Sequence, residues 1–244
     1  IETGKVLVSH QIQGWEGVAL RTRLEERFRL PVMVENDANA AGWAEYCGGA
    51  GRGTRHFFYM NIGSGIGGAL VVDGKLHNGQ GRGAGEIGHM WVPDWTQSTP
   101  GATNKLELIC SGWSIEKRVR TWKSLAADTP LARLCDRDPK KITGIMLAEA
   151  ARAGDPAATE ELRRVGETVG IALANLITLF HPERIALGGG VSLMGDVLLD
   201  PIRCSLDQHV FGPYRGRYEL TPCQLEESVV VVGALLLAGL IAKA

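Results

Sequence analysis

The sequence predicts a mixed α/β protein. Two short apolar runs, at residues 57–62 and 69–72, have the length of strands. Residues 156–180 instead carry apolar side chains at every third or fourth position, which is the spacing of an amphipathic helix. Because 45% of the 244 residues are hydrophobic, the chain can bury a large core, and the disordered and fibrous classes are excluded.

Charge and cysteine usage restrict the partners. The formal net charge is −1 and no Lys/Arg run occurs, so we predict that this segment binds neither nucleic acid nor a membrane surface. The five cysteines are scattered and form no C-x-x-C pair, so we expect reduced thiols in a cytoplasmic protein. The longest apolar stretch, residues 229–242, is too short to span a bilayer and is predicted to be a buried helix.

Local signals define the remaining elements. Asp73-Gly74 is a tight-turn signal, so the runs around it are expected to pair as antiparallel strands. His181-Pro182 should end the long helix, because proline lacks the N–H that a helix needs. In chain order we predict a helix at 18–28, a strand at 32–35, a helix at 38–46, strands at 57–62 and 69–72, a short strand at 75–77, a helix at 156–180, a strand at 184–187, a helix starting near Val191 and a last helix at 229–242.

An acidic and amide-rich segment, residues 35–41, stands between the predicted strand and helix. Asp37 should therefore lie where a strand ends and a helix begins. Its carboxylate has two possible roles. It can cap the helix by accepting backbone N–H bonds, or it can accept the proton of a substrate hydroxyl during phosphoryl transfer.

Two glycine-rich segments have the composition of phosphate or nucleotide loops. Residues 63–68 satisfy G-x-G-x-x-G, but they lead into a strand, so we reject a dinucleotide site and predict a hairpin bend. Such a bend can present N–H groups to phosphate oxygens, or it can be a plain tight turn. Residues 188–190 follow a predicted strand and could admit an adenine or ribose, or could form a sharp strand-to-helix turn.

Other polar residues would suit a neutral sugar, which offers only hydroxyl groups and needs several polar partners. Glu86 and His89 lie in a glycine-rich segment that could wrap a ligand or form an exposed loop. Glu107 has apolar neighbours, so it lies on the wet face of a helix or is paired inside the protein. We interpret His181 and His209 as helix-end and loop histidines, and the six tryptophans as packing residues.

Taken together and in this order, five segments resemble the ROK family (repressors, open reading frames, kinases), and the resemblance covers nearly the whole chain. It implies an actin-like, ribonuclease-H-like ATPase fold, in which two α/β lobes close over a cleft that contains sugar and nucleotide. The segments are residues 35–41, 62–68 and 85–89, Leu106-Glu107 with Ser111-Gly112, and residues 186–191.

The resemblance also assigns roles to single residues. Asp37 would be the catalytic base, and a hexose, ATP and Mg²⁺ would be bound in the cleft of a protein that is expected to form a homodimer. The residues that would bind sugar hydroxyls are Asn36, Glu86, His89 and Glu107. Those that would hold ATP are Gly63, Ser64 and Gly65 in the first glycine loop and Gly188, Gly189 and Gly190 in the second.

The chain departs from the family pattern in three places. Family members usually carry a zinc site that joins the histidine matching His89 to three cysteines before the position of Glu107, but no cysteine lies between these residues here. We therefore predict no structural zinc, and expect Trp91, Pro93, Trp95 and Pro100 to stiffen the loop by packing. Ser64 replaces a common threonine and keeps the hydroxyl. The first phosphate loop of the family, Asp-x-Gly-Gly-Thr, is not found.

These observations lead to a domain assignment and a functional hypothesis. The chain opens at Ile1 with sequence typical of the middle of a domain, so we expect a fragment in which most of the first lobe is absent. Residues 1–36 would belong to the N-terminal lobe, 37–228 to the sugar and nucleotide lobe, and 229–244 to a terminal helix free to pack back on the first lobe. The parent protein is expected to be a glucokinase-like, ATP-dependent hexose kinase that acts on the C6 hydroxyl. The alternatives are a sugar-sensing repressor with an upstream helix-turn-helix and a silent sugar-binding protein.

Overall fold

The central element of the computed structural model is a five-stranded sheet with the order β3-β2-β1-β6-β7, and the model describes residues 3–6, 12–80, 83–126 and 128–241. Strands β1, β2 and β3 pair antiparallel, whereas β6 runs parallel to both β1 and β7. The strands of this sheet are β1 (Phe57–Ile62), β2 (Ile66–Val72), β3 (Lys75–Leu76), β6 (Arg184–Gly188) and β7 (Glu219–Pro222), and a separate hairpin joins β4 (Trp91–Pro93) to β5 (Thr103–Lys105).

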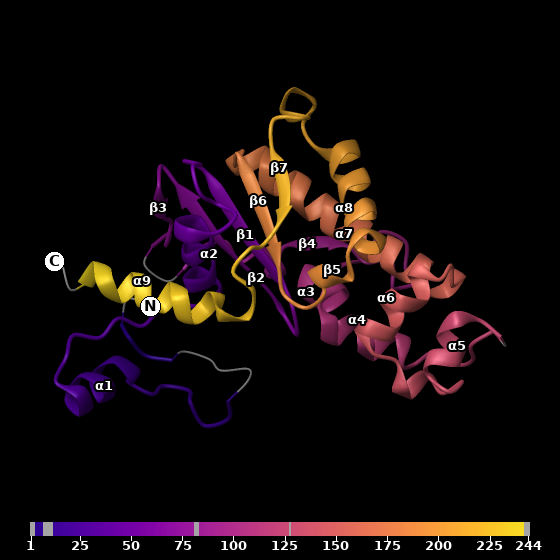
Figure 1. Ribbon diagram of the computed structural model, residues 1–244, viewed down its shortest axis with the longest axis horizontal. Coiled ribbons are helices and arrows are strands. Elements are labelled where there is room, and N and C mark those ends of the chain that lie inside the picture. The colour runs from indigo at the N-terminus through magenta and orange to yellow at the C-terminus, as the bar shows by residue number, and fades with distance from the viewer. Residues whose placement is uncertain (1–2, 7–11, 81–82, 127, 242–244) are drawn as a thin grey trace.

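Helices cover both faces of the sheet (Figure 1). Short 3₁₀ turns connect them: η1 (Ile87–His89), η2 (Pro139–Lys141), η3 (Ser192–Met194), η4 (Gly212–Tyr214) and η5 (Glu226–Ser228). The α-helices are α1 (Leu20–Phe28), α2 (Asp37–Gly48), α3 (Leu106–Cys110), α4 (Gly112–Val119), α5 (Pro130–Leu134), α6 (Gly144–Arg152), α7 (Pro156–Phe180), α8 (Asp196–His209) and α9 (Val229–Ile241).

The alternation of side chains along β1 explains these layers. Phe58 and Met60 point into the larger core, which α3, α6, α7 and α8 complete, while Phe57 and Tyr59 point to the other face, which α2 covers. Helix α2 lies very close to the sheet, because a Cβ on Gly42 would be 2.4 Å from the Cβ of Ala69. The mixed α/β class predicted from the sequence is therefore confirmed.

The long helix and its neighbours form as the periodicity predicts. Helix α7 begins at Pro156 after an Asp155 cap and ends where His181 adopts the left-handed conformation (φ 41°). Two glycines on α7 allow α8 to pack closely against it. A Cβ on Gly166 would lie 2.6 Å from the Cβ of Pro201, and one on Gly170 would lie 2.6 Å from the Cβ of Ser205. The antiparallel hairpin of β1 and β2 and the turn at residues 73–74 are also as predicted.

Five predictions from the sequence need correction. Residues 32–35 form no strand; they connect α1 to α2 and line a groove. The region after Val191 forms η3 before α8 starts at Asp196, since Gly195 interrupts the helix with φ 72°. Tryptophans are not all packing residues, because Trp91 and Trp113 are each 63% exposed. His209 is the last residue of α8 and not a loop residue.

Helix α9 is the fifth correction, because it is only partly buried. It packs tightly on α2, where a Cβ on Gly233 would come within 1.8 Å of the Ala40 carbonyl oxygen. Its other face leaves Val231 at 64% and Leu235 at 69% exposure. Within the described ranges, no helix is both long and apolar enough to cross a membrane.

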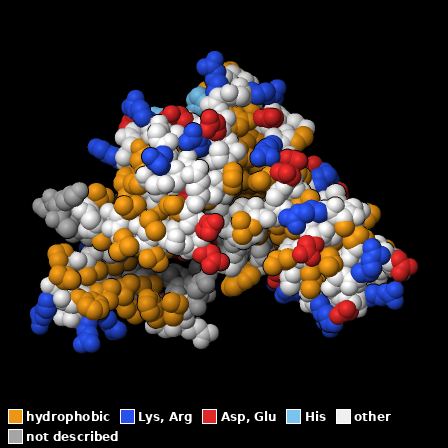
Figure 2. Space-filling model, in the orientation of Figure 1, with side chains coloured by type: hydrophobic (Ala, Val, Ile, Leu, Met, Phe, Trp, Pro, Cys, Tyr) orange, Lys and Arg blue, Asp and Glu red, His pale blue; other side chains and the backbone are white. Residues whose placement is uncertain are grey.

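A groove of about 620 Å³ separates α1 and the segment after it from α2 and α9. It is lined mainly by aliphatic side chains, and Asn36 and Asp37 stand among its lining residues. Figure 2 shows hydrophobic side chains gathered over α1, at the lower left of the molecule. This groove places the start of α2 at an accessible surface.

Candidate active site

The beginning of strand β2 is the place where two of the predicted sugar segments meet. The Ile66 N–H donates to Oε2 of Glu107 at 2.8 Å, which brings α3 to the strand. The turn η1 lies against the same residues: a Cβ on Gly88 would be 2.2 Å from the Ile66 carbonyl oxygen, and one on Gly68 would be 2.5 Å from that of Gly85. The absence of side chains at these glycines allows the two backbones to touch.

The start of α2 approaches the same strand from the other side. A Cβ on Gly67 would lie 2.9 Å from the Cβ of Ala38, the residue after Asp37. The Gly67 N–H donates to Oδ1 of Asn61 at 3.1 Å, so the side-chain amide of Asn61, near the end of β1, also lies against Gly67. The segments that carry Asp37, the 85–89 turn and Glu107 therefore converge on residues 66–68, although some seventy positions separate the first from the last.

The helix cap of α2 is Asn36, whereas the sequence had offered Asp37 for this role. The Asn36 side chain accepts from the Asn39 N–H at 3.1 Å. Asp37 is the first residue of the helix; its side chain is exposed, and Oδ1 accepts from the adjacent Ala38 N–H at 2.9 Å. The carboxylate is therefore free of the capping role and open to solvent.

Asn39 holds this turn in place, and the sequence had not singled it out. Its Nδ2 donates to Oε1 of Glu35 at 3.0 Å and to Oδ1 of Asn78 at 3.2 Å, while the residue is only 1% exposed. Its Oδ1 is buried without a hydrogen-bond partner in the described part of the chain. The signal that could have found it is its position within the 35–41 segment.

Glu86 and His89 lie at the two ends of η1. Both side chains are exposed, and the Glu86 carbonyl accepts from the His89 N–H at 3.0 Å. His89 Nδ1 lies 3.1 Å from Nζ of Lys105, which stands just before Glu107 in the chain. Lys105 is a second residue that the sequence had not indicated.

The two glycine loops lie side by side at the ends of the parallel strands β1 and β6. Asn61 is the partner of Gly188 in the ladder, and the Val191 N–H donates to the Ile62 carbonyl at 2.9 Å. Gly189 has φ 83°, and a Cβ there would be 2.6 Å from that same carbonyl oxygen. Any side chain at this position would be strained and would collide with β1, so the glycine is needed for the loops to touch.

A pocket of about 580 Å³ opens next to both loops. Gly63, Ser64 and Gly190 line it, and the Gly112 N–H connects α4 to the first glycine loop by donating to the Gly63 carbonyl at 2.7 Å. Large apolar side chains project at its edge although they are largely exposed: Trp113 at 63%, Ile145 at 72% and Leu193 at 81%. Exposed apolar side chains can pack against a flat ring, and glycine loops can bind the phosphates attached to it, so the lining of this pocket suits such a ligand.

Two charged side chains line the same pocket and were missed by the sequence analysis. Glu116 accepts from the Gly144 N–H at 3.0 Å and from Arg120 at 2.7 Å. Arg152 donates to the Met194 carbonyl at 2.7 Å. No motif marks these residues, because they come from α4 and α6, whose relative placement depends on the packing of the whole core.

Tyr59 lies beneath the second glycine loop. Burial raises its pKa, and the charges of Cys223, Glu45 and Asp37 add to that effect. A Cβ on Gly188 would be 3.3 Å from the Tyr59 ring. A neutral phenol at this position supports the loop by packing.

Comparisons with known proteins agree with this arrangement. The glucokinase of Streptomyces coelicolor is 38% identical over 231 residues, which are 92% of this chain and 72% of that protein. A solved structure of a ROK family glucokinase from Streptomyces griseus, in complex with glucose and AMPPNP, superposes with a TM-score of 0.78 at 34% identity, over 97% of this chain and 77% of that one.

A regulator shows the same fold. The solved structure of a ROK family transcriptional regulator, a homologue of the E. coli MLC protein, superposes with a TM-score of 0.80 at 26% identity, over 98% of this chain and 59% of that one. The actin-like ATPase fold that the resemblance implied is therefore confirmed. The profile of the ROK family matches residues 1–240. With the site geometry, these findings show that the chain belongs to the ROK family.

Proposed function

We propose that the protein is an ATP-dependent sugar kinase that transfers the γ-phosphoryl group to a hexose, on the C6 hydroxyl. One observation carries the proposal: the start of β2 joins the three polar segments of the candidate sugar site, and the turn before it forms the floor of the pocket beside both glycine loops. A donor site and an acceptor site that share one strand end can hold two substrates in contact.

The pocket is the proposed nucleotide site. Gly63, Ser64 and Gly190 line it, and Ser64 would offer a hydroxyl to phosphate oxygens. The Gly63 N–H already donates to the Gly65 carbonyl at 2.9 Å, so the backbone N–H groups that bind phosphate would come from the other residues of the loops at 63–65 and 188–190. The glucokinase structure from Streptomyces griseus with AMPPNP supports ATP as the donor. Mg²⁺ keeps several waters and binds mainly through substrate phosphates, so it would require at most one or two carboxylates of the protein.

The proposed sugar site consists of Asn36, Glu86, His89 and Glu107, with Asp37 as the base. Carboxylates accept and amides or imidazoles donate, so this set can pair with several hydroxyl groups. Glu107 already accepts one N–H from Ile66 and keeps lone pairs for a ligand. The glucose-bound relative supports a hexose as the acceptor.

In the proposed reaction the sugar hydroxyl oxygen attacks the γ-phosphorus, the bond from phosphorus to the β,γ-bridging oxygen breaks, and ADP leaves. The hydroxyl proton passes to the Asp37 carboxylate. Positioning of the two substrates and stabilisation of phosphate charge by loop N–H groups supply most of the rate, because little covalent chemistry falls to the protein.

A second candidate is a sugar-sensing repressor, which the likeness to the ROK transcriptional regulator favours. A sensor and a kinase would use the same sugar residues. They differ in whether nucleotide is consumed.

A coupled assay of ADP release tests the proposal, with the product of the complete reading frame and a panel of glucose, mannose, fructose and N-acetylated hexoses. We expect ADP formation that depends on one or a few of these sugars and on Mg²⁺. Calorimetry on the same panel is run in parallel. Hexose binding without ADP release would contradict the kinase and favour the sensor. If no hexose of the panel binds, both functions are contradicted.

A further inference from the structure

The zinc site implied by the family does not fit the residues of this chain. No cysteine lies between His89 and Glu107. Cys110, the nearest, is fully buried, its thiol faces the Val165 carbonyl at 3.8 Å, and burial raises its pKa to about 12. Across the described ranges, no group of three or more His, Cys, Asp and Glu side chains is placed to hold a metal ion. A tetrahedral zinc site needs four ligands.

The ring nitrogen of His89 faces a cation instead. Lys105 Nζ lies 3.1 Å from His89 Nδ1, and an ammonium can only donate in a hydrogen bond. The contact makes Nδ1 the acceptor and leaves the proton on Nε2, so the other side of the ring is a donor. A metal ion could not occupy the same lone pair.

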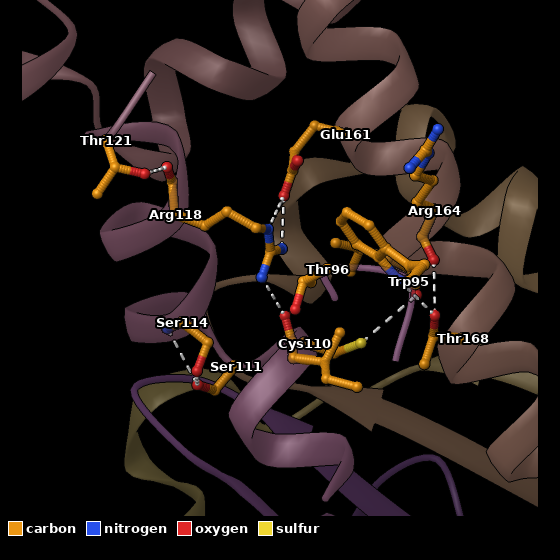
Figure 3. A network of polar contacts seen from close by, with 12 residues as sticks. Trp95, Thr96, Cys110, Ser111, Ser114, Arg118, Thr121, Glu161, Arg164 and Thr168 are labelled. Carbon is orange, nitrogen blue, oxygen red and sulfur yellow. Dashed lines mark hydrogen bonds and ion pairs between the residues drawn. The ribbon is translucent and has the colours of Figure 1, made fainter. Parts of the chain in front are cut away.

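The hairpin of β4 and β5, which connects His89 to Glu107, is anchored by Trp95. Its ring lies between two guanidinium groups (Figure 3). The Cζ of Arg118 lies 4.7 Å from the ring centroid, and the Cζ of Arg164 lies 5.3 Å from it. Its Nε1–H donates to the Thr168 hydroxyl at 3.0 Å. Cation–π contacts of this kind gain strength when they are shielded from water, and Trp95 is partly buried.

Arg118 extends this anchor to the helix that carries Glu107. Its Nε donates to Glu161 of α7 at 2.8 Å, and the two side chains are only 17% and 6% exposed. Its Nη1 donates to the Ile109 carbonyl of α3 at 2.8 Å. One guanidinium therefore connects the hairpin, α3 and α7 (Figure 3).

The turn of the hairpin is closed by Asp94, which is 4% exposed. Its carboxylate accepts from the backbone and hydroxyl of Thr96 at 2.9 and 2.6 Å and from Asn104 at 3.2 Å. Burial alone would raise the Asp94 pKa, but these bonds and the charge of Arg118 lower it below its ordinary value. The carboxylate stays ionised and holds both ends of the loop.

We propose that this metal-free anchor, made of Trp95, Arg118, Glu161 and Arg164 together with the Lys105 contact to His89, holds His89 and Glu107 in the geometry that sugar binding requires. Trp95 and Lys105 are positioning residues, since neither is assigned a contact with substrate. The sugar-binding part of the inference rests on the proposed function, whereas the metal-free part does not.

The metal-free part is tested on the purified full chain by elemental analysis and by thermal unfolding with and without a strong chelator. We expect less than about 0.1 zinc per chain and the same melting temperature in both conditions, because no ligand set is present. One zinc per chain, or a melting temperature that falls with chelator, would overturn the inference whether or not the protein is a kinase.

The positioning part uses two variants with matched controls. Lys105→Met should raise the KM or Kd for sugar about 10-fold and leave the KM for ATP within about twofold, as expected for the loss of one charged hydrogen bond, and Lys105→Arg should restore most of the affinity. The ¹⁵N shift of His89 Nδ1 should move in Lys105→Met alone.

Trp95→Leu should weaken sugar binding by about 10-fold and Trp95→Phe by less, because phenylalanine keeps a ring between the two arginines. Trp91→Leu, an exposed tryptophan on the same hairpin, is the control and should bind sugar normally. Equal losses of affinity for sugar and ATP in either variant, or an unchanged His89 shift in Lys105→Met, would overturn the positioning role. If the unsubstituted protein binds no sugar, the result counts against the proposed function. The zinc content and the melting temperature would still decide the metal-free part.

Discussion

A carboxylate in the first turn of a helix can cap the helix or act as a catalytic base. A cap needs its oxygens to accept backbone N–H bonds, whereas a base needs an oxygen that is open to the substrate. Helix α2 is capped by Asn36, whose side chain accepts a hydrogen bond from the Asn39 N–H. Asp37 accepts only from the adjacent Ala38 N–H, as far as the described residues show, and its side chain is exposed. Since the cap does not depend on Asp37, its removal should affect chemistry more than stability.

Asp37→Asn is therefore expected to lower kcat by about 10² to 10⁴, which corresponds to about 3 to 5 kcal/mol of barrier, while the melting temperature changes little. The measurement is the coupled ADP assay together with thermal unfolding. Asp196→Asn is the matched control, because Asp196 is also the exposed first residue of a helix and lies outside the lining of the pocket. Full activity in Asp37→Asn would remove the base from the mechanism.

At the scale of elements, the start of α7 shows how one side chain can fix two helices. Asp155 Oδ1 accepts from the N–H groups of Ala157 and Ala158 at 3.0 Å each, which caps α7. Oδ2 accepts from the Leu131 N–H of α5 at 3.0 Å. Burial alone would raise the pKa of this carboxyl, but the hydrogen bonds outweigh it and the pKa lies below the ordinary value.

Asp155→Asn should lower the free energy of unfolding by about 1 to 3 kcal/mol at pH 7, since an amide can cap α7 with its oxygen but presents N–H to Leu131. Because the folded pKa is lowered, the contribution of the carboxylate is complete above its unfolded pKa of about 4 and is lost as pH falls through the folded value. Urea unfolding at pH 7, 5, 4 and 3 should show the difference between parent and variant shrinking below about pH 4.

The control for this prediction is Asp138→Asn, which alters the exposed cap of a short 3₁₀ turn. It should cost less than about 1 kcal/mol. A difference between parent and Asp155→Asn that stays constant from pH 7 to pH 3 would contradict the ionised role of Asp155.

At the scale of the whole molecule, Glu45 joins α2 to a segment that lies 180 positions later in the chain. It is fully buried near the end of α2 and accepts from the Ala50 N–H at 2.7 Å. Its other oxygen accepts from the N–H groups of Gln224 and Leu225 at 2.8 Å each, just before α9. The position of α9 against α2, and with it the wall of the groove beside Asp37, depends on this carboxylate.

Glu45→Gln should lower the free energy of unfolding by about 2 kcal/mol, because an amide nitrogen replaces an acceptor that buried N–H groups require. Hydrogen exchange should speed up at Gln224 and Leu225 before it does in α7. Glu149→Gln, on the exposed face of α6, is the control with no expected effect. Unchanged exchange at residues 224–225 would show that α9 is held by its apolar contacts with α2 alone.

Local pattern was sufficient for some elements and failed for others, for reasons seen in single residues. Helix α7 begins at Pro156 and ends at Phe180 as predicted, because its periodicity and its stop signals all come from neighbouring residues. Residues 32–35 were wrongly assigned to a strand, since a strand needs a partner that local sequence does not reveal. The exposure of α9 was missed for the same reason.

The sequence by itself determined the class of fold, the ROK resemblance and the segments that carry Asp37, Glu86, His89, Glu107 and the two glycine loops. These features depend on residue types and on spacings within one or two turns. Only the tertiary structure decided that Asn36 caps α2, that Glu107 binds the Ile66 N–H, and that Trp95 lies between Arg118 and Arg164. The contacts of Glu107 and Trp95 join positions far apart in the chain, and they form only when the packing of a common core fixes the relative placement of helices and strands. The cap is local, but Asn36 and Asp37 are both good cap residues, so the sequence alone could not choose between them.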